Sequence, residues 1–346
     1  PKRDLKLETL AETLKGDIRV QMHCYRGDQM ATMLDVADEF GFRIVAFHHA
    51  VEAYKVADLL ASKGVCAAMW ADWWGFKVEA YDGIQENIAI VDAPAGSCAM
   101  LHSDSEDGIQ RLNQEAAKAM SRGVRAGLDI PPERAIRWLT VNPAKALGLD
   151  DRIGALEPGK NADVVIWNRN PFSVYALADE VLSAIKRRNA LLLAAVAFAS
   201  AISGADAASV QAESGDVLIR GAKVYTITSR GALDSADVLV RGGRIAGIVS
   251  SGENLPTPAG AKVVEAKGRP LTPGIFAGLT RIGVEEISAE SSTVDANLDF
   301  KSPGWDQKWR PEFDVALAYN PRSAVIPVAR IEGLTFAYIP DQASSR

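Results

Sequence analysis

A segment in the middle of the chain has the three parts of a secretory signal peptide. The basic triplet Lys186-Arg187-Arg188 comes first, a mostly apolar run over 190–202 follows, and Ala205-Asp206-Ala207 comes last. A basic start, an apolar centre of about 7–15 residues and an A-x-A ending are typical of export signals. The alternative is a buried helix rich in Ala and Leu. Because export signals begin chains, this segment predicts two pieces of different origin, and it favours a periplasmic or exported protein while leaving a cytoplasmic location open.

Composition narrows the function classes. The chain has 346 residues, 48% of them hydrophobic, and a net charge of −6. A length of about 100–200 residues per domain allows two domains, and an acidic balance excludes a nucleic-acid binder held by bulk electrostatics. The three cysteines (Cys24, Cys66 and Cys98) form no CxxC pair. We therefore expect neither a zinc knuckle nor a disulfide framework.

The first piece alternates strands and helices. The patterns predict strands over 17–25, 42–50, 65–74 and 97–105, and helices over 4–16, 27–41, 51–64 and 108–123. Alternation at this spacing is typical of βα units on a parallel sheet. A complete (β/α)8 barrel needs ~250 residues. About four strands therefore predict half of such a barrel.

Short strands flank the signal-like segment on both sides. Residues 163–167 form a compact β-branched run upstream, and residues 216–227 and 237–249 alternate downstream between glycine-rich turns. These patterns predict a small antiparallel sheet. Strands of both pieces can pair, since chain termini in compact domains often lie close together.

Polar side chains stand where the predicted parallel strands end. His23 ends the first strand, His48 and His49 end the second, and Asp104 ends the last. In a parallel barrel the functional side chains gather at these ends. Two imidazoles and a carboxylate suit Zn²⁺ or a similar cation, and Asp104 can also move a proton. For each residue alone, a hydrogen-bonded structural role is the competing interpretation.

The order of these residues resembles a known family. His23, His49 and Asp104, followed by NPAKALGL and IGALEPGKNADVVIW, resemble the amidohydrolase superfamily, in particular its imidazolonepropionase-like members. The resemblance covers residues 1–178. It implies the C-terminal half of a metal-dependent barrel that hydrolyses C–N bonds, with a β-sandwich built from both chain ends. It assigns His23, His49 and Asp104 as metal ligands from strands five, six and eight, and Asp104 also as the catalytic base.

Residues 208–346 resemble the opening of a second, degenerate member. LTPGIFAGLTRIG (271–283) is similar to the family's entry to barrel strand one, but Leu279 and Arg281 occupy the two histidine positions. Ala277 stands where the family has an aspartate. Neither leucine nor arginine binds a cation, so the implied metal site lacks its strand-one ligands.

Further side chains are candidates for supporting roles. Tyr25 and Arg26 follow His23 and suit a substrate carboxylate, although a salt-bridged arginine is the commoner arrangement. Trp70 is a candidate pocket wall, with core packing as the alternative. His102 precedes Asp104 by two positions, hence on the same strand face, and is a candidate partner to a metal ligand.

Together these features predict an α/β chain: a partial (β/α)8 TIM-type barrel with a composite antiparallel β-sandwich. The expected divisions are a barrel half (1–142), the closing sandwich strands (143–180) and an apolar linker (181–208). The opening sandwich strands (209–270) and the start of a second barrel half (271–346) follow. The leading hypothesis is a zinc-dependent hydrolase of non-peptide C–N bonds in a small molecule. One alternative is an inactive read-through fusion of two tandem genes, which pairs with a related subunit as a homo- or hetero-oligomer. The other is a permuted domain whose apolar linker anchors it to a membrane.

Overall fold

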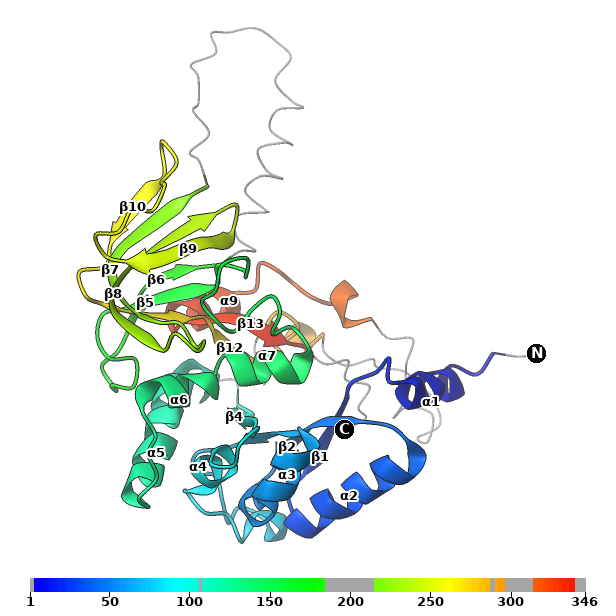
Figure 1. Cartoon of the computed structure of the whole chain (residues 1–346). Coiled ribbons are helices and arrows are strands. Elements are labelled where there is room, and N and C mark those ends of the chain that lie inside the picture. The colour runs from blue at the N-terminus through cyan, green and yellow to red at the C-terminus, as the bar shows by residue number, and fades with distance from the viewer. Residues whose placement is uncertain (1–2, 106–107, 184–214, 287–289, 296–313, 340–346) are drawn as a thin grey trace, which may run out of the picture.

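The computed structural model describes residues 3–105, 108–183, 215–286, 290–295 and 314–339. Within these ranges the chain is a mixed α/β protein. A parallel sheet of four strands lies at one end, a mixed sheet of seven strands at the other, and a parallel strand pair between them (Figure 1). The signal-like segment over 186–207 lies outside the described residues. No helix of the described part is long and apolar enough to cross a membrane.

The parallel sheet confirms the predicted strand order of the first piece. Its strands run β1-β2-β3-β4. The bounds are β1 Val20–Cys24, β2 Ile44–His49, β3 Cys66–Met69 and β4 Ala99–Leu101. Every residue of β2, β3 and β4 is buried, as in sheets covered on both faces. The strands are shorter than predicted: β3 ends before Trp70 and Ala71, which stay buried, and β4 ends before the polar run His102-Ser103-Asp104.

Helices connect and follow these strands. α2 ends at Gly41, which takes a left-handed φ of +74° that glycine adopts without strain. The helical elements are α1 Leu5–Lys15, α2 Gly27–Phe40, η1 Ala53–Val56, α3 Ala57–Lys63, η2 Val78–Ala80, α4 Asn87–Asp92, η3 Gly108–Arg111, α5 Leu112–Arg125, α6 Pro132–Arg137 and α7 Val141–Leu147.

The seven-stranded sheet joins the two pieces of the chain. Its order is β6-β5-β11-β7-β8-β9, with β10 also paired to β7. The bounds are β5 Val164–Trp167, β6 Ala178–Leu182, β7 Val217–Tyr225, β8 Ala232–Arg241, β9 Arg244–Ser250, β10 Lys262–Glu265 and β11 Pro270–Pro273. Strand β11 is antiparallel to β5 from the first piece and parallel to β7 from the second.

Two expectations for this sheet are wrong. It is mixed rather than antiparallel, because β10 and β11 both run parallel to β7. Residues 237–249 form two strands rather than one, since the chain reverses at Gly242 and Gly243, which both have positive φ. A two-residue turn with positive φ at both positions matches the twist of a hairpin.

A strand from the second piece is hydrogen-bonded to the segment between α6 and α7 of the first piece. The backbone N–H of Phe276 in β12 (Ile275–Leu279) donates to the carbonyl of Leu139 at 2.9 Å. β12 pairs in parallel with β13 (Leu334–Tyr338). Along the chain, the short helices η4 (Ser291–Thr293) and η5 (Val315–Leu317) follow β12, and α9 (Val325–Ile331) precedes β13. The main hydrophobic core contains Trp138 and Trp167 together with Ile275, so the two pieces share it.

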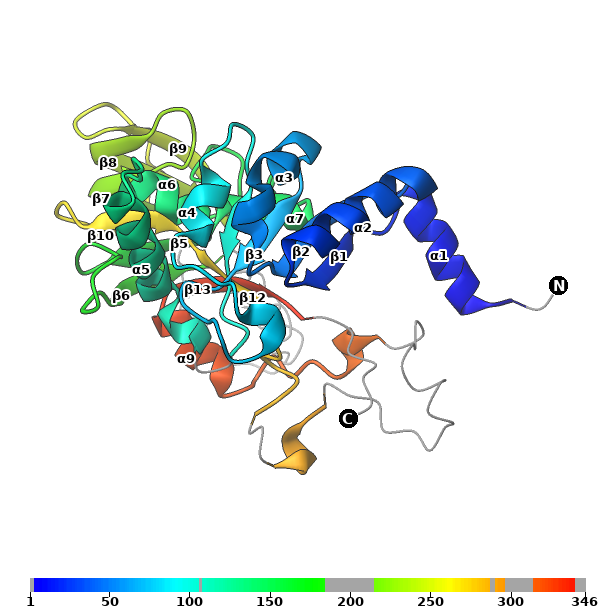
Figure 2. The same cartoon turned by 90° about the horizontal axis from the view of Figure 1, so that it is seen from below.

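Helix α1 contributes nothing to that core. Asp4 caps its first turn and Gly16 ends it, but none of its residues is buried. Its leucines are strongly exposed, with Leu7 at 63%. Figure 2 shows α1 extending from the body beside α2.

The expectation that the cysteines form no disulfide is wrong for two of them. Cys66 in β3 and Cys98 directly before β4 are bonded, with their Cα atoms 4.5 Å apart. Their separation of 32 residues gave no local signal. Neighbouring parallel strands bring them together, since Ala67 and Ala99 are register partners.

Candidate active site

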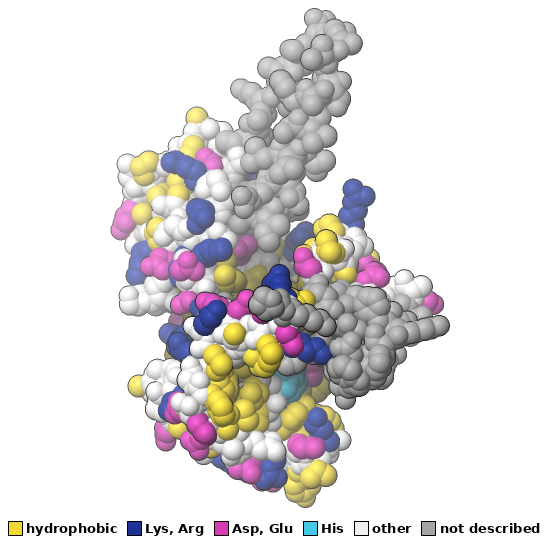
Figure 3. Space-filling view, turned by 90° about the vertical axis from the view of Figure 1, so that its right-hand side faces the viewer, with side chains coloured by type: hydrophobic (Ala, Val, Ile, Leu, Met, Phe, Trp, Pro, Cys, Tyr) yellow, Lys and Arg dark blue, Asp and Glu magenta, His cyan; other side chains and the backbone are white. Residues whose placement is uncertain are grey.

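The ends of three parallel strands bring together His23, His49 and Asp104. His23 Nδ1 lies 2.7 Å from His49 Nε2, and His49 Nδ1 lies 3.7 Å from a carboxylate oxygen of Asp104. His49 is buried, whereas His23 is exposed and Asp104 is half exposed. The three side chains therefore form a row in which the buried His49 lies between the more exposed His23 and Asp104. Figure 3 shows a histidine at the surface beside a group of hydrophobic side chains.

The backbone at this site is strained. Positive φ is found at His49 (+69°), Ala50 (+36°) and Asp104 (+56°). Such conformations cost about 1–3 kcal/mol each in residues other than glycine, and they concentrate at functional sites. The side chains of His49 and Asp104 thus start from an unfavourable backbone conformation, which the packing around them must stabilise.

Asn87 and Glu52 hold the segment that follows His49. The amide of Asn87, in α4, donates to the carbonyls of Ala50 and Val51, each at 3.0 Å. The carboxylate of Glu52 accepts the backbone N–H of Gly27 at 2.9 Å, at the start of α2. Both side chains are buried. The sequence patterns did not single out Asn87, because a lone asparagine gives no periodic or spacing signal.

Burial keeps the imidazoles neutral. The pKa of His49 falls to about 3, first because burial disfavours its charged form and then because His23, His48 and Lys77 repel that charge. Burial also lowers the pKa of His23, against the opposing pull of Asp104. Neutral rings leave one nitrogen lone pair each, which is what a cation or a hydrogen-bond donor requires.

The remaining two histidines, His48 and His102, are both buried. Nε2 of His48 donates a hydrogen bond of 2.7 Å to the side-chain oxygen of Gln21, and burial lowers the pKa of His48 to about 4. His102 is buried, its ring lies 5.4 Å from that of His49, and burial holds its pKa well below the usual value. All four histidines of the chain thus gather in one cluster.

Aromatic rings enclose His49. Tyr25 stacks on it with ring centres 4.8 Å apart, and Trp70 lies at the same distance. Trp70 also stacks on His102 at 5.4 Å. Tyr25 and Trp70 are therefore placed where a ligand near His49 would meet them. Arg26 instead pairs with Asp28 through two hydrogen bonds of 3.0 Å.

The donor types suit zinc, whereas their spacing is that of a hydrogen-bonded pair. Two nitrogens that share a tetrahedral zinc at ~2.0–2.1 Å lie about 3.3 Å apart. The 2.7 Å between His23 and His49 is shorter. Among the described residues, no group of three or more His, Cys, Asp or Glu side chains has an arrangement that holds a metal ion. His23 faces Nε2 of His49 whereas Asp104 faces Nδ1, so in this arrangement the three side chains do not converge on one cation.

The second piece adds no ligand from its described side chains. Ala277 is buried in β12, and Arg281 forms an ion pair of 2.9 Å with Glu285. Leu279 ends β12, which lies beside the histidine cluster: a Cβ at Gly278 would stand 3.7 Å from Cβ of His102. The strand expected to carry the missing ligands therefore lies next to the site, but the residues at positions 277, 279 and 281 are not metal ligands.

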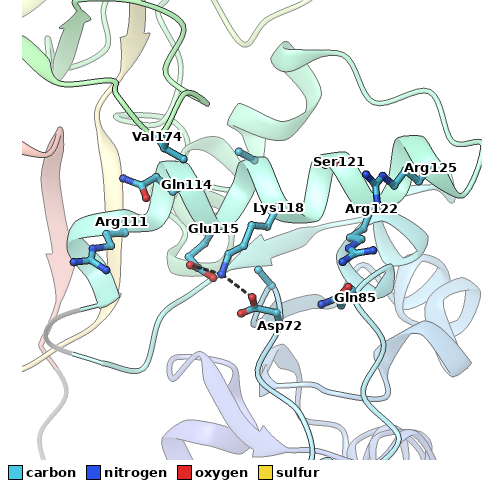
Figure 4. Close-up of a pocket in the computed structure, with 12 residues that line it drawn as sticks. Asp72, Gln85, Arg111, Gln114, Glu115, Lys118, Ser121, Arg122, Arg125 and Val174 are labelled. Carbon is cyan, nitrogen blue, oxygen red and sulfur yellow. Dashed lines mark hydrogen bonds and ion pairs between the residues drawn. The ribbon is translucent and has the colours of Figure 1, made fainter.

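A groove of about 600 Å³ lies along α5, away from the imidazole row. Its middle is closed by Lys118, which pairs with Asp72 and Glu115 at 2.7 Å each (Figure 4). It contains no histidine and none of the three row residues, so its size gives no reason to move the candidate site there.

Known proteins resemble this chain over part of its length. The model of the "Amidohydrolase family" matches residues 7–201, more than half of the chain. The chain belongs to the amidohydrolase family. The amidohydrolase TasK of Hapsidospora irregularis is 31% identical over 182 residues, covering 51% of this chain and 18% of that protein. The imidazolonepropionase of Shewanella oneidensis is 51% identical over 39 residues, covering 11% of this chain and 10% of that protein.

Among solved structures, an amidohydrolase from Thermotoga maritima is 34% identical with a TM-score of 0.47, and the match covers 53% of this chain and 46% of that one. The chain spans less than a fifth of the length of the two relatives named above.

Proposed function

We propose that this family member is a metal-dependent hydrolase of C–N bonds other than peptide bonds, open-chain or cyclic, in a small molecule. The observation that carries the proposal is that the ends of parallel strands bring two neutral imidazoles, His23 and His49, together with the carboxylate of Asp104. Backbone strain at two of these residues supports a functional role.

When bound, a divalent cation, zinc for this donor set, supplies the Lewis acidity that activates water and polarises a carbonyl. Neutral His23 and His49 provide the nitrogen lone pairs. The half-exposed carboxylate of Asp104 accepts a proton from the attacking water and passes it to the leaving nitrogen. Tyr25 and Trp70 enclose His49 and limit the access of other water to it.

Zinc titration of the full chain tests the proposal. The purified chain is stripped with a chelator and titrated with zinc by calorimetry, alongside His23→Ala and His49→Ala. We expect both variants to lose at least about tenfold in affinity, since each removes one of three ligands. His48→Gln is the matched control, because it removes an imidazole that is bonded to Gln21 rather than to the row. Zinc affinity that is independent of His23 and His49 contradicts the proposal.

A second candidate function is that of an inactive scaffold derived from two fused amidohydrolases. Leu279 and Arg281 in place of ligands favour it. So does the open sheet, since β1 pairs only with β2 among the described strands. Such a scaffold would associate with a second copy or a related amidohydrolase subunit. A cooperative unfolding transition in a chain that sediments as a monomer contradicts this candidate.

We also propose that the protein is exported. The basic-apolar-Ala-x-Ala pattern over 186–207 supports this, and so does the Cys66–Cys98 disulfide, because disulfides persist in oxidising compartments. Fractionation of cells that express the chain, with both cysteines tested for a free thiol, checks the proposal. A reduced chain confined to the cytoplasm contradicts it.

A further inference from the structure

The loop between β3 and α4 exposes an unusual number of large apolar side chains. We call residues 71–86 the aromatic loop. Within nine positions it exposes Trp73 (44%), Trp74 (56%), Phe76 (56%), Val78 (87%) and Tyr81 (74%). Exposed apolar side chains that gather in one place mark ligand grooves or interaction sites, whereas single ones are ordinary.

The aromatic loop is continuous with the candidate active site. Trp70 contacts Trp73 in a stacked arrangement and Phe76 edge-on, both with ring centres 5.6 Å apart. Trp70 in turn lies 4.8 Å from His49. The ammonium of Lys77 lies 3.8 Å from the ring centre of Tyr25, which also stacks on His49 and lies 5.9 Å from Trp70. A ligand held near His49 therefore lies within reach of this set of rings.

The loop is held in position although its rings are exposed. Asp72 at its start pairs with Lys118, and Asp82 near its end pairs with Lys55, both at 2.7 Å. The hydroxyl of Tyr54 donates to the carbonyl of Asp82 at 3.1 Å. These bonds tie down both ends and engage two of the loop's acidic groups, which leaves the segment between them largely apolar.

Trp70 adds a polar observation. It is 6% exposed, and its indole N–H has no hydrogen-bond partner among the described residues. A buried donor without an acceptor is costly. The nitrogen itself is buried, so Trp70 supports the loop by packing beneath Trp73 and Phe76 rather than by offering this donor to a ligand.

We infer that the aromatic loop is the apolar subsite of this active site, and that the substrate class is amides carrying an aromatic or similarly flat apolar group next to the C–N bond. The inference deepens the proposed function and rests on it. The amide is placed beside the imidazole row, and its ring stacks on the exposed Trp73 and Phe76 at the usual separation of about 4.5–7 Å.

The test compares two neutral amides that differ only in the ring. N-benzylacetamide and N-methylacetamide are titrated against the metal-free full chain by ligand-observed NMR, so that binding is measured without turnover. We expect the benzyl compound to bind at least about tenfold more tightly. Trp73→Ala and Phe76→Ala should each remove most of that difference, while Trp73→Phe should keep part of it.

The matched control is Phe40→Ala, the same deletion at a phenylalanine that is 62% exposed on α2. It should leave both affinities unchanged. The inference is overturned if the two amides bind with equal affinity. It is also overturned if Trp73→Ala and Phe76→Ala keep the wild-type melting temperature and have no effect on binding. A change in sedimentation rather than in ligand binding also overturns it, by showing that a second copy covers the loop. Ring-dependent binding without hydrolysis of any amide by the zinc-loaded chain contradicts the proposed function alone.

Discussion

Replacing Leu271 by alanine tests whether the two pieces form one folding unit. Leu271 is fully buried in β11, with Ile166 of β5 on one side and Val224 of β7 on the other. The change removes three carbons, about 2.4 kcal/mol of transfer free energy at ~0.8 kcal/mol each. The cavity left between three strands adds to this, so the free energy of unfolding should fall by about 3–4 kcal/mol.

Urea unfolding measures this effect. With a denaturant dependence of roughly 3 kcal/mol per molar, the midpoint should fall by about 1 M. Tryptophan fluorescence reports mainly on the first piece, because five of the seven tryptophans precede residue 183. Far-UV circular dichroism reports on the whole chain. Both signals should shift together, since β11 lies between strands of both pieces.

The control is Val263→Ala in β10, where the side chain is 44% exposed. Its effect should stay within about 0.5 kcal/mol. Two separate transitions, or a midpoint for Leu271→Ala equal to that of the control, would refute the reasoning that one sheet holds the pieces together.

Three further predictions concern the site and its supports. Because burial lowers the pKa of His48 to about 4, below its usual 6.5, stability that is fully present above pH 6.5 should be lost as the pH falls toward 4. The loss should be about 1.4 kcal/mol per pH unit and about 3 kcal/mol in all, and melting temperatures of His48→Gln should depend less on pH over this window. Cys66→Ser should lower the free energy of unfolding by about 3–4 kcal/mol in oxidising buffer, since it opens a loop of 32 residues, and a reductant should lower that of the wild type but not of the variant. Asn87→Ala removes three hydrogen bonds to the segment after β2, two of them buried and one partly buried. Thermal unfolding should show a cost of about 2–4 kcal/mol, and an unchanged melting temperature contradicts this role.

The sequence predicted the first piece well because its signals are local. Strands such as β2 are continuous apolar runs, and α2 ends at a glycine that accepts positive φ. The same signals placed His23, His49 and Asp104 at strand ends. Parallel strands share one direction, so their carboxyl ends meet at one edge of the sheet. The proximity of the three side chains followed from that topology.

The mixed sheet was harder to predict. The run 237–249 alternates without interruption except at Gly242 and Gly243, and only the hairpin geometry divides it into two strands. Whether β10 and β11 run parallel or antiparallel to β7 depends on the path of the chain between them, which the alternation of side chains does not encode.

The residue pattern by itself determined which elements form and which side chains end the parallel strands, because those depend on neighbours a few positions apart. Tertiary structure alone decided that Cys66 meets Cys98, that Asn87 holds the segment after His49, and that β11 lies between strands of both pieces. It also decided that two imidazoles face each other at hydrogen-bonding distance. These contacts join residues tens of positions apart, and their formation depends on the packing of whole elements rather than on any local preference.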